Sequence, residues 1–142
     1  MIKREFIKRQ LEELGRAISK VITEMQKFKE LGKVDEAFGI AQETLKNTFD
    51  FDIENILCIP DDKFIEIVIK DEKFSAAHLN YMGDLLYATA ELFIQKRETE
   101  KAKILFQKVL SVFHFVDNNE KTFSLERNNK IESIENYFGI IN

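Results

Sequence analysis

An apolar stripe near the start of the chain constrains the fold most. Its members follow one another at alternating spacings of four and three residues, which places them on one face of a helix. A helix from Ile2 to Leu31 would be about 45 Å long at 1.5 Å per residue. Gly32 is placed to end it, because glycine readily adopts the left-handed conformation of helix C-termini. The stripe consists of Ile7, Leu11, Leu14, Ile18, Val21, Met25 and Phe28.

Apolar residues at spacings of three and four predict further helices downstream. We expect them over about residues 35–49, 75–96, 99–116 and 124–138. The run Asp117-Asn118-Asn119 predicts the turn before the last of these helices.

The segment between residues 61 and 70 has two interpretations. Pro60 and the carboxylates after it favour a helix start. The run from Phe64 to Ile69 is rich in β-branched residues, which favours a strand. We favour the helix, because a lone strand in a helical chain would leave its backbone groups without partners.

The length of 142 residues suits one domain with its own core. A hydrophobic content of 44% argues against a disordered chain. No apolar run approaches the roughly 20 residues of a membrane-spanning helix, and no secretory signal is visible at the N-terminus. We therefore expect a cytoplasmic protein that uses no membrane. The single cysteine, Cys58, excludes an internal disulfide and fits a reducing compartment.

Charge is unevenly distributed along the chain. Residues 1–34 carry nine basic and five acidic side chains, whereas residues 35–72 carry three basic and eleven acidic ones. A basic segment can attract nucleic acid, but the interleaved glutamates would repel the phosphates, so we expect no nucleic-acid partner. The simplest interpretation is a solvated helix face with internal ion pairs. Alternatively, the basic first segment complements the acidic middle segment, within one chain or between two.

The chain also matches itself at a shift of 65 residues. Small or apolar residues then align with similar ones, as Ala37 does with Ala102 and Phe28 with Phe93. The shift also aligns Asp35 with Glu100. Such self-similarity is typical of helical repeat proteins.

The repeated segments resemble a tetratricopeptide-like helix-turn-helix. The resemblance lies in residues 32–37 and 97–110, where a turn is followed by a close-packing alanine and, in the second copy, by the aromatic Phe106. Arg97 and Ala41 depart from the repeat, which favours glycine and an aromatic residue there. The layout is also similar to an uncharacterised bacterial family of this type. That similarity rests on Arg9-Gln10-Leu11-Glu12 and Ser124-Leu125-Glu126-Arg127.

The resemblance implies a single all-α domain over residues 1–142. Antiparallel helix pairs would stack as a short tetratricopeptide-like right-handed superhelix. The pairs would span about residues 2–49 and 75–116, with a long N-terminal helix in the first of them. An irregular short-helix segment would occupy residues 50–73, and a capping helix would occupy about 124–138.

No set of residues with the spacing of an active site or metal centre stands out. His78 and His114 lie outside any metal-ligand motif, and Cys58, between two apolar residues, is expected to be a small buried hydrophobe. Asp61 and Asp62 are typical of helix caps. We therefore expect no enzyme, no cofactor and no metal.

The resemblance instead implies protein binding, because the first helix of each tetratricopeptide-like pair lines a concave groove. We expect a protein or peptide partner there, although these residues could instead pack against the middle segment or the last helix. The expected groove residues are Ser19, Ile22, Gln26 and Lys29 in the first copy and Asp84, Tyr87, Glu91 and Ile94 in the second.

Two other functions remain open. The first is a self-associating structural protein, a homodimer in which a second chain covers Ile7, Leu11 and Leu14. The second is a small-ligand sensor or enzyme with a pocket on one helix. That pocket would lie near His78, Tyr81, Asp84 and Tyr87.

Overall fold

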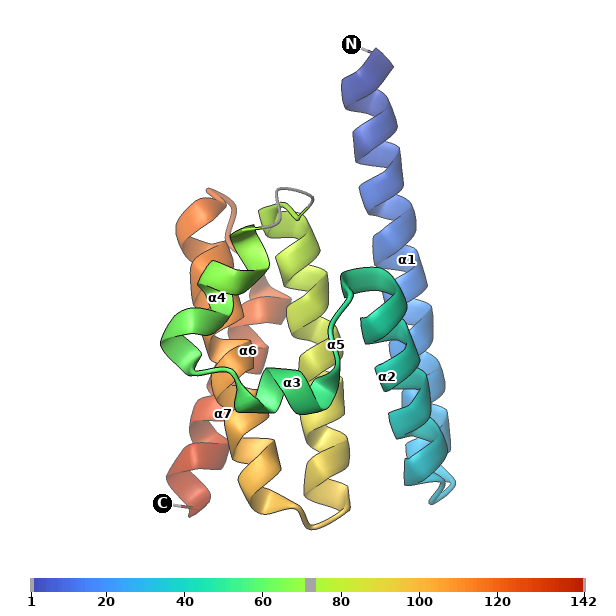
Figure 1. Ribbon diagram of the computed structural model, residues 1–142, viewed down its shortest axis with the longest axis vertical. Helices are drawn as coiled ribbons and strands as arrows, with labels where there is room; N and C mark the ends of the chain where they lie inside the picture. The colour runs from blue at the N-terminus through green and yellow to red at the C-terminus, as the bar shows by residue number, and fades with distance from the viewer. Residues whose placement is uncertain (1, 71–73, 142) are drawn as a thin grey trace.

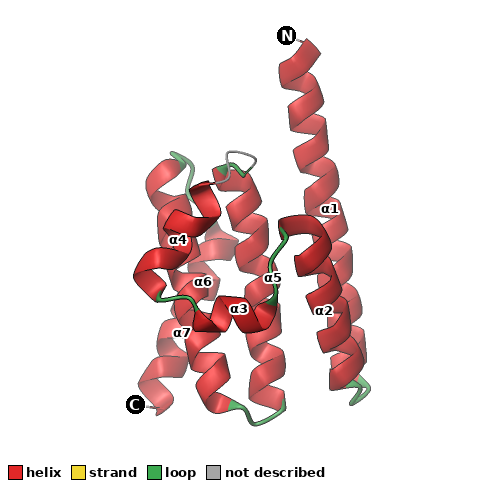
Figure 2. Cartoon of the chain, in the orientation of Figure 1, coloured by secondary structure: helices red, strands yellow, loops and turns green. Residues whose placement is uncertain are grey.

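The computed structural model describes residues 2–70 and 74–141, and it is helical throughout apart from short connections (Figure 2). The described part of the chain holds no strand, so the helical interpretation of residues 61–70 is confirmed. No helix in the described ranges has both the length and the hydropathy of a membrane span. The helices are α1 (Ile2–Glu30), α2 (Val34–Phe49), α3 (Ile53–Cys58), α4 (Asp61–Lys70), α5 (Ala76–Gln95), α6 (Thr99–Asn119) and α7 (Leu125–Ile141).

The two long helix pairs, α1–α2 and α5–α6, close with the same turn. Gly32 ends α1 with φ at +76°, and Arg97, 65 residues later, follows α5 with φ at +63°. Both residues therefore adopt the left-handed conformation that terminates helices. Equivalent backbone hydrogen bonds close the two turns, from Lys33 N to Phe28 O at 2.8 Å and from Glu98 N to Phe93 O at 2.9 Å.

Helix α5 lies at the centre of the bundle. It packs most extensively against α6, and it also contacts both α1 and α2 (Figure 1). Gly83 allows the close approach of α5 to α6, because a Cβ there would lie within 3.0 Å of the ring of Phe113. The core therefore runs through both helix pairs. Its largest fully buried side chains include Phe49, Phe64 and Phe93.

The middle segment forms two short helices that lie against α6. Asp52 caps α3 by accepting a hydrogen bond from Glu54 N at 3.0 Å, and Gln42 donates to the same carboxylate at 3.0 Å. Helix α4 buries Phe64 and Val68, while an ion pair links its Asp61 to Lys108, whose side chain is buried. The segment expected to be an irregular run of short helices thus forms α3 and α4 over the described residues.

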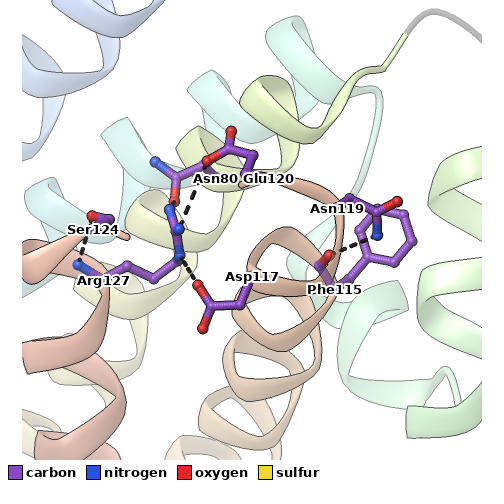
Figure 3. A network of polar contacts seen from close by, with 7 residues as sticks. All are labelled: Asn80, Phe115, Asp117, Asn119, Glu120, Ser124 and Arg127. Carbon is purple, nitrogen blue, oxygen red and sulfur yellow. Dashed lines mark hydrogen bonds and ion pairs between the residues drawn. The ribbon is translucent and has the colours of Figure 1, made fainter. Parts of the chain in front are cut away.

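Helix α7 is attached to α5 and α6 by a polar cluster around the buried Arg127 (Figure 3). Arg127 Nε lies 2.6 Å from Asp117 Oδ1, and Nη1 donates to Asn80 Oδ1 at 3.0 Å. Its Nη2 lies 3.7 Å from Glu120 and makes no hydrogen bond.

The turn predicted at Asp117-Asn118-Asn119 is wrong, because α6 continues to Asn119. Two contacts stabilise this last turn of the helix. Asn119 Nδ2 donates to Phe115 O at 2.8 Å, and Glu120 N donates to Val116 O at 2.8 Å. The extension places Asp117 on the helix, where it pairs with Arg127.

Candidate functional site

The predicted groove residues of α1 differ in exposure. Ser19 and Gln26 are exposed, whereas Ile22 packs against the core and Lys29 is half-buried. Near the end of α1, Gln95 of α5 donates a hydrogen bond to Lys29 O at 3.3 Å. The fold thus brings the C-terminal ends of α1 and α5 together.

The predicted groove residues in the middle of α5 contact α7 of the same chain. Lys130 Nζ lies 2.7 Å from Asp84 Oδ1 and 5.9 Å from the ring centroid of Tyr87. Tyr87 also packs edge-to-face on Phe106, with 5.6 Å between ring centroids. Burial raises the pKa of the Asp84 carboxyl, and Lys130 opposes that shift. Asp84 and Tyr87 therefore hold the last helix in place.

The other two predicted residues of α5 remain at the surface. Ile94 is 39% exposed. Glu91 is half-buried and forms no ion pair or hydrogen bond with any described residue. Burial raises the pKa of Glu91, while Lys29 of α1 and Lys130 of α7 lower it. Glu91 thus lies between two lysines from different helices.

Lys130 was missed by sequence reasoning, although a signal for it exists. Arg127 and Lys130 are three residues apart, so they lie on one face of α7. Asn80 and Asp84, which they contact, are four residues apart on one face of α5. Two matched polar spacings could therefore have indicated that α7 packs across α5.

The predicted self-association residues lie along the first half of α1. We call residues 2–13 the α1 arm, because Figure 1 shows this end of α1 extending past the other helices. Ile7 is 47% exposed, and its neighbour Phe6, which lies off the predicted stripe, is 57% exposed. Leu11 is half-buried. Leu14 packs against the core, so it is already covered by its own chain.

The α1 arm ends where α1 meets α5. A Cβ at Gly15 would lie 2.7 Å from the hydroxyl oxygen of Tyr81, so glycine permits this approach. Tyr81, Gly15 and Ser19 also line an open hollow on the surface.

The residues proposed for a ligand pocket are used in separate structural contacts. His78 forms the capping box of α5: its Nδ1 accepts a hydrogen bond from Ser75 N at 3.1 Å. Burial lowers the pKa of His78. Tyr81 faces α1, while Asp84 and Tyr87 contact α7. The four side chains therefore do not gather around one cavity.

The expectation that Cys58 is buried is wrong. Cys58 is the last residue of α3 and is exposed. It lines a surface hollow of about 530 Å³ together with Asp61, Ile104 and Lys108. Cys58 is exposed because the core-facing positions of this short helix are Ile53 and Ile56. Within the described ranges, no cluster of three or more His, Cys, Asp or Glu residues could hold a metal ion.

Comparison with known proteins found no matching family model, no matching curated protein and no matching solved structure.

Proposed function

We propose that this protein is a non-catalytic protein–protein interaction module, an adaptor or scaffold of the tetratricopeptide-like type. Two observations support the repeat arrangement. The pairs α1–α2 and α5–α6 end their first helices with the same left-handed turn, and α5 contacts both helices of the first pair. In such an arrangement, α1 and α5 would line the binding surface.

The main support for this proposal is that Glu91 is half-buried and has no hydrogen-bond partner among the described residues. Its carboxylate oxygens are not fully buried, so they stay available to a donor. A partner that donates N–H groups or a cation to Glu91 would form a charge-assisted contact there. The exposed Ile94 lies one helical turn away and offers an apolar contact beside it.

The binding surface we propose is therefore narrower than the predicted groove. It comprises Ser19, Gln26 and Lys29 on α1 with Glu91 and Ile94 on α5. Asp84 and Tyr87 are excluded because Lys130 of α7 already contacts them. A surface that combines a carboxylate, an apolar side chain and exposed hydrogen-bonding groups suits an extended or helical segment of another protein.

Co-purification from cells that naturally produce the chain tests this function. Ser19→Arg with Gln26→Arg would obstruct the surface without touching the core, since both residues are exposed. The matched control is Glu43→Arg, an exposed position on α2. We expect a stoichiometric second protein with the wild type and the control, and its loss with the double variant. Equal recovery with all three forms, or no second protein, would contradict the proposal.

A further inference from the structure

The α1 arm presents an apolar and basic face with no covering helix. On a helix surface, Ile7 neighbours the residues three and four positions away. These are Lys3, Arg4, Gln10 and Leu11, none of which is acidic. The arm's glutamates, Glu5, Glu12 and Glu13, are instead spaced three or four residues from Arg9. The face around Ile7 therefore combines apolar side chains with uncompensated positive charge.

Helix α4 presents the opposite combination at its surface. Ile69 is 40% exposed and lies four residues from Ile65 and three from Glu66, on the same side of the helix. Asp62 begins this strip one turn earlier and is exposed. Phe64 and Val68 point into the core, and Ile65 packs partly against it, whereas Glu66 and Ile69 stay at the surface. An apolar and acidic strip thus runs along α4.

We propose that the α1 arm binds α4 of a second copy of the chain as a parallel helix pair. Residues at equal heights in a parallel pair face each other across the interface. When Arg4 of the arm is placed beside Asp62 of α4 in the second copy, one pair of opposite charges and two pairs of apolar residues face each other. The layers are Arg4 with Asp62, Ile7 with Ile65 and Leu11 with Ile69.

Flanking charges agree with the same register. In a parallel helix pair, a charged residue beside the apolar layers contacts a residue of the partner helix. That residue lies about five positions beyond the one at the same height. Lys3 of the arm then meets Glu66 of the second copy. Among the described residues, Glu66 pairs with Lys63, and this pair is weak because its atoms lie 3.8 Å apart and both side chains are largely exposed.

The arrangement of the helices allows this contact to form twice. In Figure 1, the α1 arm and α4 lie toward the same end of the molecule on opposite sides of α5, and their chains run in opposite directions. A twofold axis perpendicular to the helices reverses the chain direction of α4 in the second copy. This α4 then runs parallel to the arm of the first copy and lies on the same side as that arm. The dimer is therefore closed and isologous.

Pairing of two arms with each other is less favourable. A parallel arm pair would place Arg4 against Arg4 and Lys3 near Lys8, and like charges in contact are destabilising. An antiparallel arm pair would need Leu14 to complete its layers, and Leu14, like Ile65 of α4, already packs partly against its own core. Charge therefore favours the acidic strip of α4 as the partner of the arm.

Charge reversal tests the interface through the oligomeric state. Sedimentation equilibrium of the wild type should give twice the chain mass of 16.7 kDa. Lys3→Glu with Arg4→Glu, or Asp62→Arg with Glu66→Lys, should raise the dissociation constant by about tenfold or more. The chain carrying all four changes should dimerise again. Arg16→Glu with Lys20→Glu, two exposed changes on the same helix, is the control for net charge.

Several outcomes would overturn the proposal. These are a monomer at all concentrations, a dimer that ignores the arm and α4 changes, and a fourfold variant that stays monomeric. If the protein is monomeric and its arm binds anionic phospholipid vesicles, the partner of the arm is a lipid surface and not a second copy of the chain. Thermal unfolding of each variant excludes loss of the fold as the cause.

Disulfide trapping tests the register and the direction of the helix pair. With Cys58→Ser as background, Arg4→Cys and Asp62→Cys in one chain should form a covalent dimer on oxidation, because their Cα atoms would lie within disulfide range. Arg4→Cys with Ile69→Cys should not form one, since these positions lie at opposite ends of the proposed contact. The reverse result would contradict the parallel register.

Discussion

Lys130 Nζ on α7 lies 2.7 Å from Asp84 Oδ1 on α5, and both side chains are mostly buried. This contact decides how much of the predicted groove remains accessible, because it places α7 over the middle of α5. The surface beside α1 is left uncovered by this contact. A polar pair of residues 46 positions apart in the sequence therefore determines which part of α5 stays accessible.

Removal of this lysine should destabilise the fold. Lys130→Ala leaves the Asp84 carboxylate mostly buried without its cation, which we expect to cost about 1–3 kcal/mol of unfolding free energy. Urea denaturation measures this change. Lys63→Ala removes a lysine from the exposed pair with Glu66 and should change stability by less than about 0.5 kcal/mol. Equal effects of the two substitutions would show that α7 does not depend on Lys130.

Two glycines should respond oppositely to alanine. Gly83→Ala places a methyl group against the ring of the fully buried Phe113, so we expect a loss of about 1–3 kcal/mol from overpacking. Gly39 lies within α2 with open space around its Cβ position. Gly39→Ala should therefore stabilise the protein by about 0.5–1 kcal/mol, because alanine favours the helix. A stable Gly83→Ala variant would contradict the close packing of α5 on α6.

The two equivalent turns give a matched pair of predictions. Arg97→Gly should stabilise the protein, because a non-glycine residue in the left-handed conformation costs about 1–2 kcal/mol. Gly32→Ala should destabilise it by a similar amount, since Gly32 has φ at +76°. Thermal unfolding of both variants provides the measurement. Changes of the same sign would show that the two turns are not equivalent.

The stability contributed by Glu91 should depend on pH. Burial raises the pKa of Glu91 in the folded state, so the folded chain holds this proton more tightly than the unfolded chain does. Stability is then greatest below the unfolded pKa and decreases as pH rises through the folded pKa. Glu91→Gln should raise the melting temperature at pH 7.5.

Melting curves between pH 4 and pH 8 test this sign. The gain from Glu91→Gln should shrink toward the acid end, where the wild-type carboxyl is protonated. The exposed Glu30→Gln controls for the loss of one negative charge. A stabilisation that grows as the pH falls would mean that Glu91 is favourably paired in the folded protein.

Local patterns predicted most of the helices, because helix periodicity is encoded within a few residues. The stripe from Ile7 to Phe28 predicted α1, and Gly32 predicted its end. Arg97 departs from the repeat in residue type, yet its backbone adopts the same left-handed turn. Backbone hydrogen bonds of the neighbouring residues close this turn as they close the turn at Gly32. Comparing residue types at positions 32 and 97 therefore understates how similar the two turns are.

Contacts between distant segments were harder to predict. Asp117 resembled a turn residue, but its pairing with Arg127 keeps it at the end of α6. Cys58 has apolar neighbours in sequence, but the orientation of the short helix α3 exposes it. Asp84 and Tyr87 both contact α7, which is the packing against the last helix that the sequence left open as an alternative to a groove.

We propose that the chain acts by binding another protein through the surface between α1 and α5. The most direct measurement is site-specific photo-crosslinking in cells that naturally produce the chain, with the reactive group at Gln26 or, as control, at Glu43. We expect one discrete protein adduct from Gln26 and none from Glu43. The absence of an adduct from Gln26, or the same adduct from both positions, would contradict it.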